Sequence, residues 1–347
     1  MVRKSEVNIF QCITLTLVFF ILSCGCVTNP ISGSHQRIER INESIDKGID
    51  FLAANQMDNG EFKTFASRDQ DMRNSYFESS PFITPFVLYS IREVNNEKVP
   101  GIIEKGTNFL LSEQQPGGVW QFWGSSTGYT IPPDLDDIAM ISAVLEMNNK
   151  SFDPNKELIL SNKNDEGLFL TWIRSDGKAN DVECVVNANV IFYLKEDDPV
   201  VCSYINDAIK FNKPCVIWYP NKMVLYYAVS RNLKHNLSCF EESREPMVKS
   251  VLAQQRGDGS FGTDLDTAFA INTLLNCGYT GIEVSRGIDN LLKKQNPGGS
   301  WTKSPFFINP FPDRGPTINY GSEELNTALA VEALNNYLAH QKAQDTS

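Results

Sequence analysis

Apolar residues recur along most of this chain at the three- and four-residue spacing of helices, and the helical segments come in pairs. The first segment of a pair is amphipathic, as in 45–52 and 288–292, and so presents one apolar face. The second is apolar nearly all round, as in 82–91, 138–147 and 268–275. A helix of the second kind is typically buried on every side. The pattern therefore predicts an all-α fold with an outer layer of amphipathic helices and an inner layer of buried ones.

A short phrase lies between the two helices of most pairs: Gln, three residues, Gly, one residue and an aromatic residue. One further pair, 204–211 with 223–229, lacks the phrase, which makes six pairs at a period of about fifty residues. An open solenoid would need polar faces on its terminal repeats, whereas six hairpins of one sense match a closed ring. We therefore expect an (α/α)6 toroid whose inner helices begin at one common rim, with Trp120 and Trp301 buried at the junctions between repeats. The copies are Gln56-Gly60-Phe62, Gln114-Gly118-Trp120, Gln255-Gly259-Phe261 and Gln295-Gly299-Trp301, with a decayed copy at Lys163-Gly167-Phe169.

The repeated phrase resembles the QW-type motif of the terpenoid cyclase and protein prenyltransferase toroids, over residues 38–340. A second motif, Asp134-Leu135-Asp136-Asp137 after Pro132-Pro133, resembles the D-x-D-D motif of protonation-initiated, class II terpenoid cyclases. The resemblance implies that Asp136 is the proton donor and that Asp134 and Asp137 are its flanking acids. Ile138 replaces the Thr that commonly follows the motif.

Two interpretations of this acidic triplet remain open. Three carboxyl groups within one helical turn, behind an apolar ring, cannot all ionise cheaply, so one should keep its proton and serve as an acid. Alternatively, Asp134 is an N-cap and Asp137 occupies the capping-box position, so that two of the three acids serve the helix end.

Other residues are candidates for binding at the same rim. A carbocation would need aromatic faces around it. Acids recur at equivalent places in other repeats and would give an acidic mouth suited to a cationic or polyhydroxylated ligand. Asn187, in an apolar inner helix, should hydrogen-bond a neighbouring helix or point into the lumen, and the first is favoured. The binding candidates are Trp120, Trp123, Trp172, Tyr219, Glu183, Asn187, Asp264, Asp266 and Glu323, and further aromatic candidates are Tyr76, Phe77, Trp218, Phe306, Phe307 and Tyr320.

The N-terminus reads as an export signal. A basic start and an apolar run too short to span a bilayer predict a signal peptide over residues 1–23. The stretch Ile21-Leu22-Ser23-Cys24 resembles a bacterial lipobox, which implies a lipid on Cys24, a membrane partner and an exported lipoprotein of the cell envelope. A plain secretory signal is the alternative. Residues 24–37 are then a short linker, and 38–347 form a single toroid domain.

Net charge, cysteine content and the positions of the histidines bear on which partners, disulfides and metals to expect. The net charge of −11 argues against a nucleic-acid partner. Five mature cysteines beyond Cys26, an odd number at irregular spacing, predict no disulfide framework. None of the three histidines falls within a predicted inner segment, the last of which ends at Leu338, and Met140 stands where a magnesium-binding D-D-x-x-D motif would have its last Asp. We expect no metal and no cofactor.

Two functions of different class follow. The first is an acid-initiated isomerase or cyclase of a membrane-soluble polyprenoid, although the resembling families usually place that site between two toroids and this chain has one. The second is a binding module for a glycan, peptide or lipid, whose carbohydrate-active form would oppose Asp136 to Asp266 or Glu323. A scaffold whose mouth consists only of capped helix ends is a third possibility.

Overall fold

The structure is a computed structural model that describes residues 30–309 and 317–346. Chain contacts divide the protein into Met1–Arg37 and Ile38–Ser347, and the description below concerns the second unit. The predicted signal peptide and the predicted lipidation at Cys24 lie outside the described residues.

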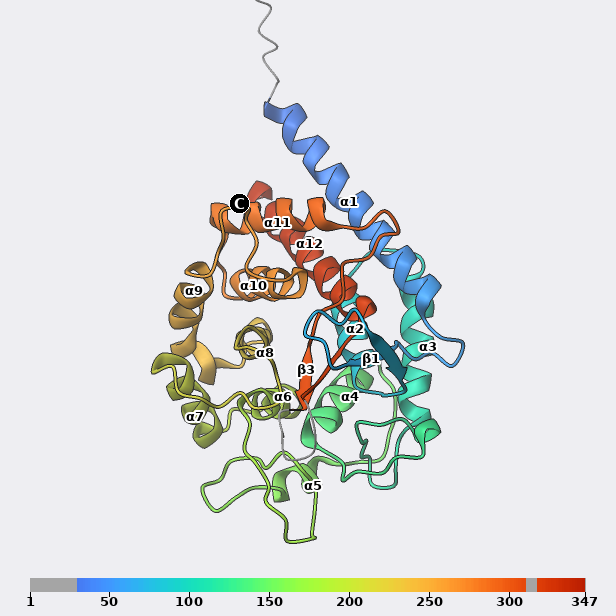
Figure 1. Cartoon of the computed structure of the whole chain (residues 1–347). Coiled ribbons are helices and arrows are strands. Elements are labelled where there is room, and N and C mark those ends of the chain that lie inside the picture. The colour runs from blue at the N-terminus through green and yellow to red at the C-terminus, as the bar shows by residue number, and fades with distance from the viewer. Residues whose placement is uncertain (1–29, 310–316, 347) are drawn as a thin grey trace, which may run out of the picture. The chain divides into compact units, whose positions relative to one another are not determined.

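Six inner helices form a closed ring. Each packs against the next, and the last packs against the first, so that no inner helix is left at an open end (Figure 1). Their side chains are buried on nearly every face, as their composition predicts. The inner helices are α2 (Ile83–Ile91), α4 (Leu135–Met147), α6 (Cys184–Leu194), α8 (Met223–Lys234), α10 (Asp264–Asn276) and α12 (Glu323–Thr346).

Six outer helices surround this ring and alternate with the inner ones along the chain (Figure 1). They bury one face only, as α11 does with Val284, Ile288 and Leu291. The predicted (α/α)6 toroid is confirmed. The outer helices are α1 (Pro30–Asn55), α3 (Val99–Ser112), α5 (Lys156–Ser161), α7 (Pro199–Lys210), α9 (Arg244–Leu252) and α11 (Ile282–Lys294), and two short 3-10 helices are η1 (Ser125–Thr127) and η2 (Ser238–Ser243).

The repeated phrase fastens each hairpin to the next. The side-chain Nε2 of Gln295 donates to the carbonyl of Ser44 at 2.8 Å, which joins the last repeat to the first and closes the ring. Gly299 has φ +93°, and a Cβ there would lie 2.2 Å from the carbonyl oxygen of Lys47, so only glycine permits the approach. Corresponding bonds run from Gln56 to Ile102 and from Gln255 to Glu283.

The two tryptophans of the phrase are core residues. Trp120 and Trp301 are both fully buried, which confirms the predicted burial at repeat junctions. The indole N–H of Trp120 donates to the carbonyl of Leu110 at 2.7 Å, and that of Trp301 donates to Leu291 at 2.9 Å. Each indole therefore satisfies its single donor inside the core.

Asn187 plays a role that neither of its two predicted orientations describes. Its Oδ1 accepts the backbone N–H of Phe169 at 3.0 Å, and its Nδ2 donates back to the Phe169 carbonyl at 2.9 Å. The amide thus ties the turn phrase of its own repeat to the inner helix, as a threonine does in three other repeats. The equivalent bonds run from Phe62 to Thr84, from Phe261 to Thr267 and from Trp301 to Thr327, whereas the corresponding position in the second repeat is Ile138.

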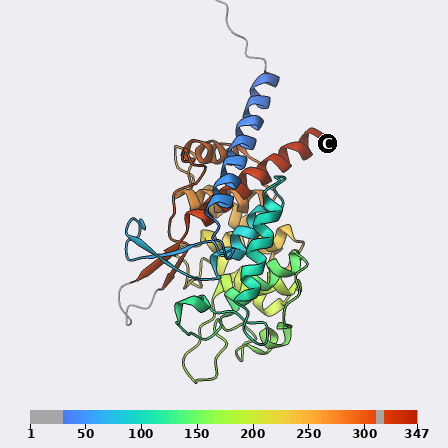
Figure 2. The ribbon, with the colours of Figure 1, turned by 90° about the vertical axis from the view of Figure 1, so that its right-hand side faces the viewer.

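A small antiparallel sheet, absent from the all-α prediction, joins the first and last repeats. Its strands are β1 (Thr64–Ser67), β2 (Ser75–Glu78), β3 (Phe307–Asn309) and β4 (Ile318–Gly321), in the order β2-β1-β4-β3. Each strand pair precedes an inner helix, so the sheet lies at the rim where the inner helices begin (Figure 2). The amide of Ile308 donates to the carbonyl of Trp218 at 2.8 Å, which carries β3 across to the fourth repeat.

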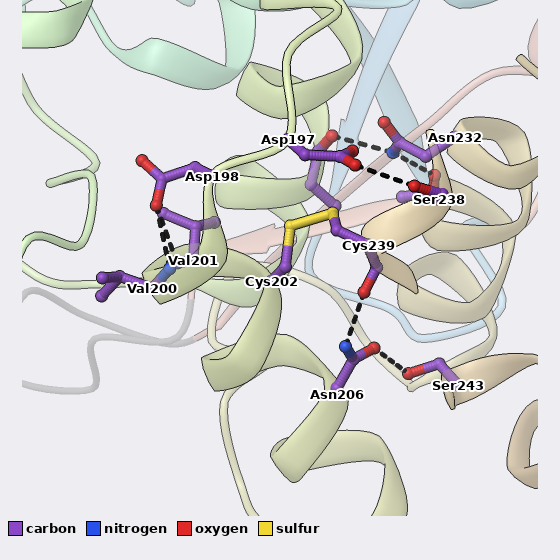
Figure 3. Close-up of a disulfide and its surroundings, with 12 residues drawn as sticks. Asp197, Asp198, Val200, Val201, Cys202, Asn206, Asn232, Ser238, Cys239 and Ser243 are labelled. Atoms are coloured by element: carbon purple, nitrogen blue, oxygen red, sulfur yellow. Dashed lines mark hydrogen bonds between the residues drawn. A yellow bond between two sulfur atoms is a disulfide. The ribbon is translucent and has the colours of Figure 1, made fainter. Parts of the chain in front are cut away.

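Two disulfides contradict the expectation that the cysteines make no framework. Cys184 pairs with Cys215, and Cys202 pairs with Cys239, which leaves Cys277 as a buried thiol. Both bonds join neighbouring repeats, so the pairing follows from the stacking of hairpins and not from sequence spacing. The Cys202–Cys239 bond links α7 to η2, and beside it Asn206 donates to the Cys239 carbonyl at 2.7 Å (Figure 3).

Candidate functional site

A cavity of about 120 Å³ opens at the rim where the inner helices begin. Half of its lining residues are aromatic, and the triplet is its acidic part. Among the described residues, the lining contains no Lys and no Arg. The lining residues are Phe82, Phe122, Trp123, Ile131, Asp134, Asp136, Asp137, Thr171, Trp172, Val186, Trp218, Phe307, Asn309 and Tyr320.

Asp134 caps the helix that carries the triplet, as predicted. Its backbone is extended at φ −124° and ψ 156°, and its Oδ1 accepts the backbone N–H of Asp137 at 2.9 Å. The reciprocal bond of a capping box is missing, because neither carboxyl oxygen of Asp137 has a hydrogen-bond partner among the described residues. Capping therefore accounts for Asp134 and leaves Asp137 unexplained.

Asp136 is held by two side chains from other repeats. It is 5% exposed. The amide Nδ2 of Asn189, on α6, donates to its Oδ1 at 2.5 Å, and the hydroxyl of Tyr219, in the loop before α8, hydrogen-bonds its Oδ2. Both carboxyl oxygens of Asp136 are thus oriented, and the group still borders the cavity.

Burial raises the pKa of all three acids. It raises the pKa of Asp134 to about 7, against the hydrogen bonds that the cap makes. It raises the pKa of Asp137 well above the usual range, and the neighbouring Asp134 carboxyl raises it further. The pKa of Asp136 is also raised by burial, although Tyr219 and Asn189 oppose the shift. Burial therefore shifts all three carboxyl groups toward their neutral forms beside an apolar cavity.

The sequence reasoning missed Asn189 and Arg231. Arg231 is fully buried on α8, and its Nη2 donates to Asn189 Oδ1, which fixes the amide so that Nδ2 faces Asp136. The carbon of the guanidinium lies 4.4 Å from the ring centroid of Phe192. The available signal was a polar residue inside an otherwise apolar inner helix, because such a residue needs a buried partner.

Glu183 and a disulfide position the loop that carries Tyr219. Glu183 caps α6 by accepting the Val186 N–H at 2.8 Å, and its other oxygen accepts the N–H of Ile217 at 3.3 Å. Burial raises its pKa well above the usual range. The bond between Cys184 and Cys215 anchors the same loop. Glu183 thus lies behind the cavity wall and not among its lining residues.

The aromatic wall includes three of the predicted tryptophans, Trp123, Trp172 and Trp218. Trp123 donates its indole N–H to Glu78 Oε2 at 3.1 Å, and Trp172 donates to Asp181 Oδ1 at 3.3 Å. The ring of Phe307, on β3, stacks on Trp218 with 5.8 Å between centroids and 6° between planes. The predicted Phe307, Trp218 and Tyr320 also line the cavity, whereas Tyr76 and Phe77 on β2 are exposed.

Several predicted binding residues are not brought to this cavity. Trp120 belongs to the core. Asp266 completes a capping box with Thr263 and is no lining residue. Glu323 accepts the Ser300 hydroxyl at 2.7 Å, and Asp264 lines a separate surface groove. The acids that recur from repeat to repeat therefore mainly serve the starts of helices, and the cavity keeps only the triplet.

Residues 30–309 and 317–346 contain no group of three His, Cys, Asp or Glu side chains arranged to hold a metal ion. In the same residues, no helix is both long enough and apolar enough to cross a bilayer.

No protein-family model and no curated protein matches this chain, but solved structures do. A type II terpene cyclase, MstE from Scytonema, superposes with a TM-score of 0.68 at 16% identity, over 86% of this chain and 97% of that one. The same cyclase has been solved with geranylgeranyl dihydroxybenzoate as its substrate.

Two other toroids are more distant. The ent-copalyl diphosphate synthase of Streptomyces platensis gives 0.51 at 18% identity, over 74% of this chain and 50% of that one. An unsaturated glucuronyl hydrolase specific for heparin gives 0.58 at 11% identity, over 88% and 98%. Identities this low establish the architecture alone. The chain therefore has the α/α toroid fold of the class II terpenoid cyclases.

Proposed function

We propose that this chain is an acid-initiated isomerase or cyclase of a polyprenoid, with Asp136 as the proton donor. One observation carries the proposal. Asp136 is a buried carboxylic acid that borders an aromatic cavity, and its two oxygens are oriented by Asn189 and Tyr219. A retained proton beside a dry π-rich wall is the arrangement that alkene protonation needs.

The reaction balances without a cofactor. The O–H bond of Asp136 breaks, and the proton forms a new C–H bond at one alkene carbon, which leaves a tertiary carbocation and the Asp136 carboxylate. In a cyclase, the electron pair of the next alkene closes a ring and moves the cation along the chain. Solvent water takes up a proton from a neighbouring carbon, which ends the sequence, and solvent returns a proton to the Asp136 carboxylate. The product is therefore an isomer of the substrate, and the acid is restored. Rings such as Trp172 and Trp218 would stabilise the cations.

The lining indicates an uncharged substrate. A diphosphate would need basic partners, and among the described residues that line the cavity there is no Lys or Arg. Small-molecule sites typically measure about 300–1,000 Å³, so the 120 Å³ cavity would have to widen to admit a long prenyl chain. A prenyl chain without phosphate is the substrate class that the site supports.

We further propose that the protein is exported and held at a membrane through a lipid on Cys24. Disulfides persist mainly in oxidising compartments, and the chain has two of them within its toroid. A membrane anchor would place the ring beside a membrane-soluble substrate.

The carbohydrate alternative is less well supported. Its second carboxylate was expected from Asp266 or Glu323, and neither lines the cavity. Exposed acids around the opening of the cavity would have favoured a carbohydrate-directed function.

Deuterium transfer from solvent tests the proposal. The full-length protein would be incubated in D₂O with membrane lipid extract and, separately, with squalene and with geranylgeraniol. We expect an isomeric product that carries solvent deuterium at the protonated carbon, detected by mass spectrometry. Asp136→Asn should form none, whereas the matched control Asp207→Asn, an exposed acid of α7, should be fully active. Equal product from Asp136→Asn would refute the role of Asp136.

A further inference from the structure

A second group of buried charges lies deeper in the ring, beyond the cavity. Arg231 on α8 is fully buried, and Glu332 on α12 is 4% exposed. Tyr227 lies between them: its hydroxyl donates to Glu332 Oε2 at 2.8 Å, and its ring centroid is 5.5 Å from the guanidinium carbon of Arg231. Neither charged residue lines the cavity of the candidate site.

Arg231 reaches the proposed acid through one intermediary. Its Nη2 donates to Asn189, and Asn189 donates to Asp136 at 2.5 Å. The positive charge of Arg231 lowers the pKa of Asp136 against the effect of burial. An uncompensated guanidinium at this place would therefore pull the proton off the acid.

Glu332 is better placed than Asp136 to carry the negative charge that balances Arg231. It accepts two hydroxyl donors, Tyr227 and Ser90, each at 2.8 Å. Burial raises its pKa, whereas Lys234, the two donors and Arg231 lower it. Asp136 also accepts two donors, but it has one cation, separated from it by a neutral amide, and two further acids beside it. A buried arginine without a counter-charge costs several kcal/mol, so one carboxylate must ionise, and these contacts favour Glu332.

Tyr89, Tyr227 and His235, three titratable groups beside Arg231, carry no charge at neutral pH. Burial raises the pKa of Tyr89 and of Tyr227, and burial together with Arg231 lowers the pKa of His235 to about 4. Lys234 lies at the edge of the group, where its Nζ is 3.6 Å from Glu93 Oε2, and Arg92 acts there on Tyr89 and His235.

We infer that Glu332 is the counter-ion of Arg231 and thereby keeps Asp136 protonated. The inference rests on the proposed function and adds a tuning residue that does not touch the substrate. The Arg231–Asn189 pair orients the acid, and Glu332 cancels the charge that this orientation brings with it. Asp136 is thus held in a fixed orientation and still keeps its proton.

Infrared spectroscopy of the protonated carboxyl group tests the inference without a substrate. The C=O band that is present in the wild-type protein and absent from Asp136→Asn identifies neutral Asp136. At pH 7 we expect Glu332→Gln to lose this band, because Arg231 then draws the charge onto Asp136. The control Glu324→Gln, another buried glutamate of α12, should keep it. The double variant Arg231→Met/Glu332→Gln removes both charges and should restore the band.

A second measurement does not depend on the folding of Glu332→Gln. In Arg231→Met, Glu332 loses the positive charge of Arg231 and should become protonated. A new carboxyl C=O band should then appear, and it should shift when glutamate is labelled with ¹³C. Persistence of the Asp136 band in Glu332→Gln at pH 7, or no new glutamate band in Arg231→Met, would overturn the inference.

Activity separates this inference from the proposed function. A shift of one pH unit in the Asp136 pKa changes the protonated fraction about tenfold, so Glu332→Gln should turn over about tenfold slower at pH 7 and recover at lower pH. If the infrared bands behave as expected but no deuterated product forms, the proposed function is refuted and the counter-ion role of Glu332 is not. If Glu332→Gln forms product with an unchanged pH profile, the counter-ion role of Glu332 is refuted and the proposed function is not.

Discussion

Replacing Asp136 by asparagine separates a neutral acid from an ionised one. Asn189 and the Tyr219 hydroxyl each donate to one carboxyl oxygen of Asp136. In a neutral Asp136, the Tyr219 oxygen would instead accept the carboxyl O–H, because a phenolic hydroxyl can donate or accept. An asparagine side chain of nearly the same volume presents an acceptor and a donor in the same places. Two hydrogen bonds are kept, so the free energy of unfolding should change by less than about 1 kcal/mol.

An ionised Asp136 predicts a different result. Asp136→Asn would then remove the negative charge that balances buried Arg231, and breaking a buried ion pair costs about 3 to 5 kcal/mol. Asp136→Ala is costly in either state, because Asn189 and Tyr219 lose their partner at about 1 to 3 kcal/mol each. Asp134→Ala loses only a cap, at about 0.5 to 2 kcal/mol.

Urea unfolding of the three variants at pH 7, alongside product formation from lipid extract, measures both effects. We expect Asp136→Asn to be as stable as the wild-type protein and to be inactive. Asp134→Ala should be less stable and keep activity in proportion to its folded fraction. A loss of more than about 3 kcal/mol in Asp136→Asn, or turnover equal to wild type, would refute the neutral-acid reasoning.

Four further changes have defined outcomes. Trp301→Ala should cost about 3 to 5 kcal/mol by urea unfolding, and a cost below about 1 kcal/mol would mean that the repeat phrase is not packed as described. The double variant Cys184→Ser/Cys215→Ser opens a loop of 31 residues and should cost about 3 to 4 kcal/mol by chain entropy; unchanged stability and activity would show that this bond does not hold the Tyr219 loop. The pKa of Asp134 is about 7 in the folded protein, above its unfolded value, so its stabilising contribution is lost as pH rises from about 4 through 7, by about 2 to 4 kcal/mol. Asp134→Asn keeps the cap and should flatten this loss in melting curves at pH 5 and pH 8, whereas a parallel decline would contradict it. Cys24→Ala should leave the protein in the aqueous phase of a detergent partition, and retention with the membrane would count against the lipid anchor.

The sequence by itself determined the ring of six helical hairpins and the N-cap at Asp134. Helical periodicity and the repeated phrase depend on local spacing, and both recur at fixed intervals, so they predicted six hairpins and the burial of Trp120 and Trp301. The N-cap at Asp134 is equally local, because an N-cap acts within one helical turn. The sheet was missed since its two hairpins join through β1 and β4 across the ring closure, and nothing near Ala66 in sequence announces Tyr320 opposite it.

Only the tertiary structure decided what Asp136 contacts. Asn189, Tyr219 and Arg231 come from two other inner helices and a loop, and their separation in sequence carries no signal of contact. The same holds for the disulfides, whose partners meet because successive hairpins stack. Sequence patterns report which residues are buried within one element, whereas the partner of a buried polar group depends on how elements from distant repeats pack against each other.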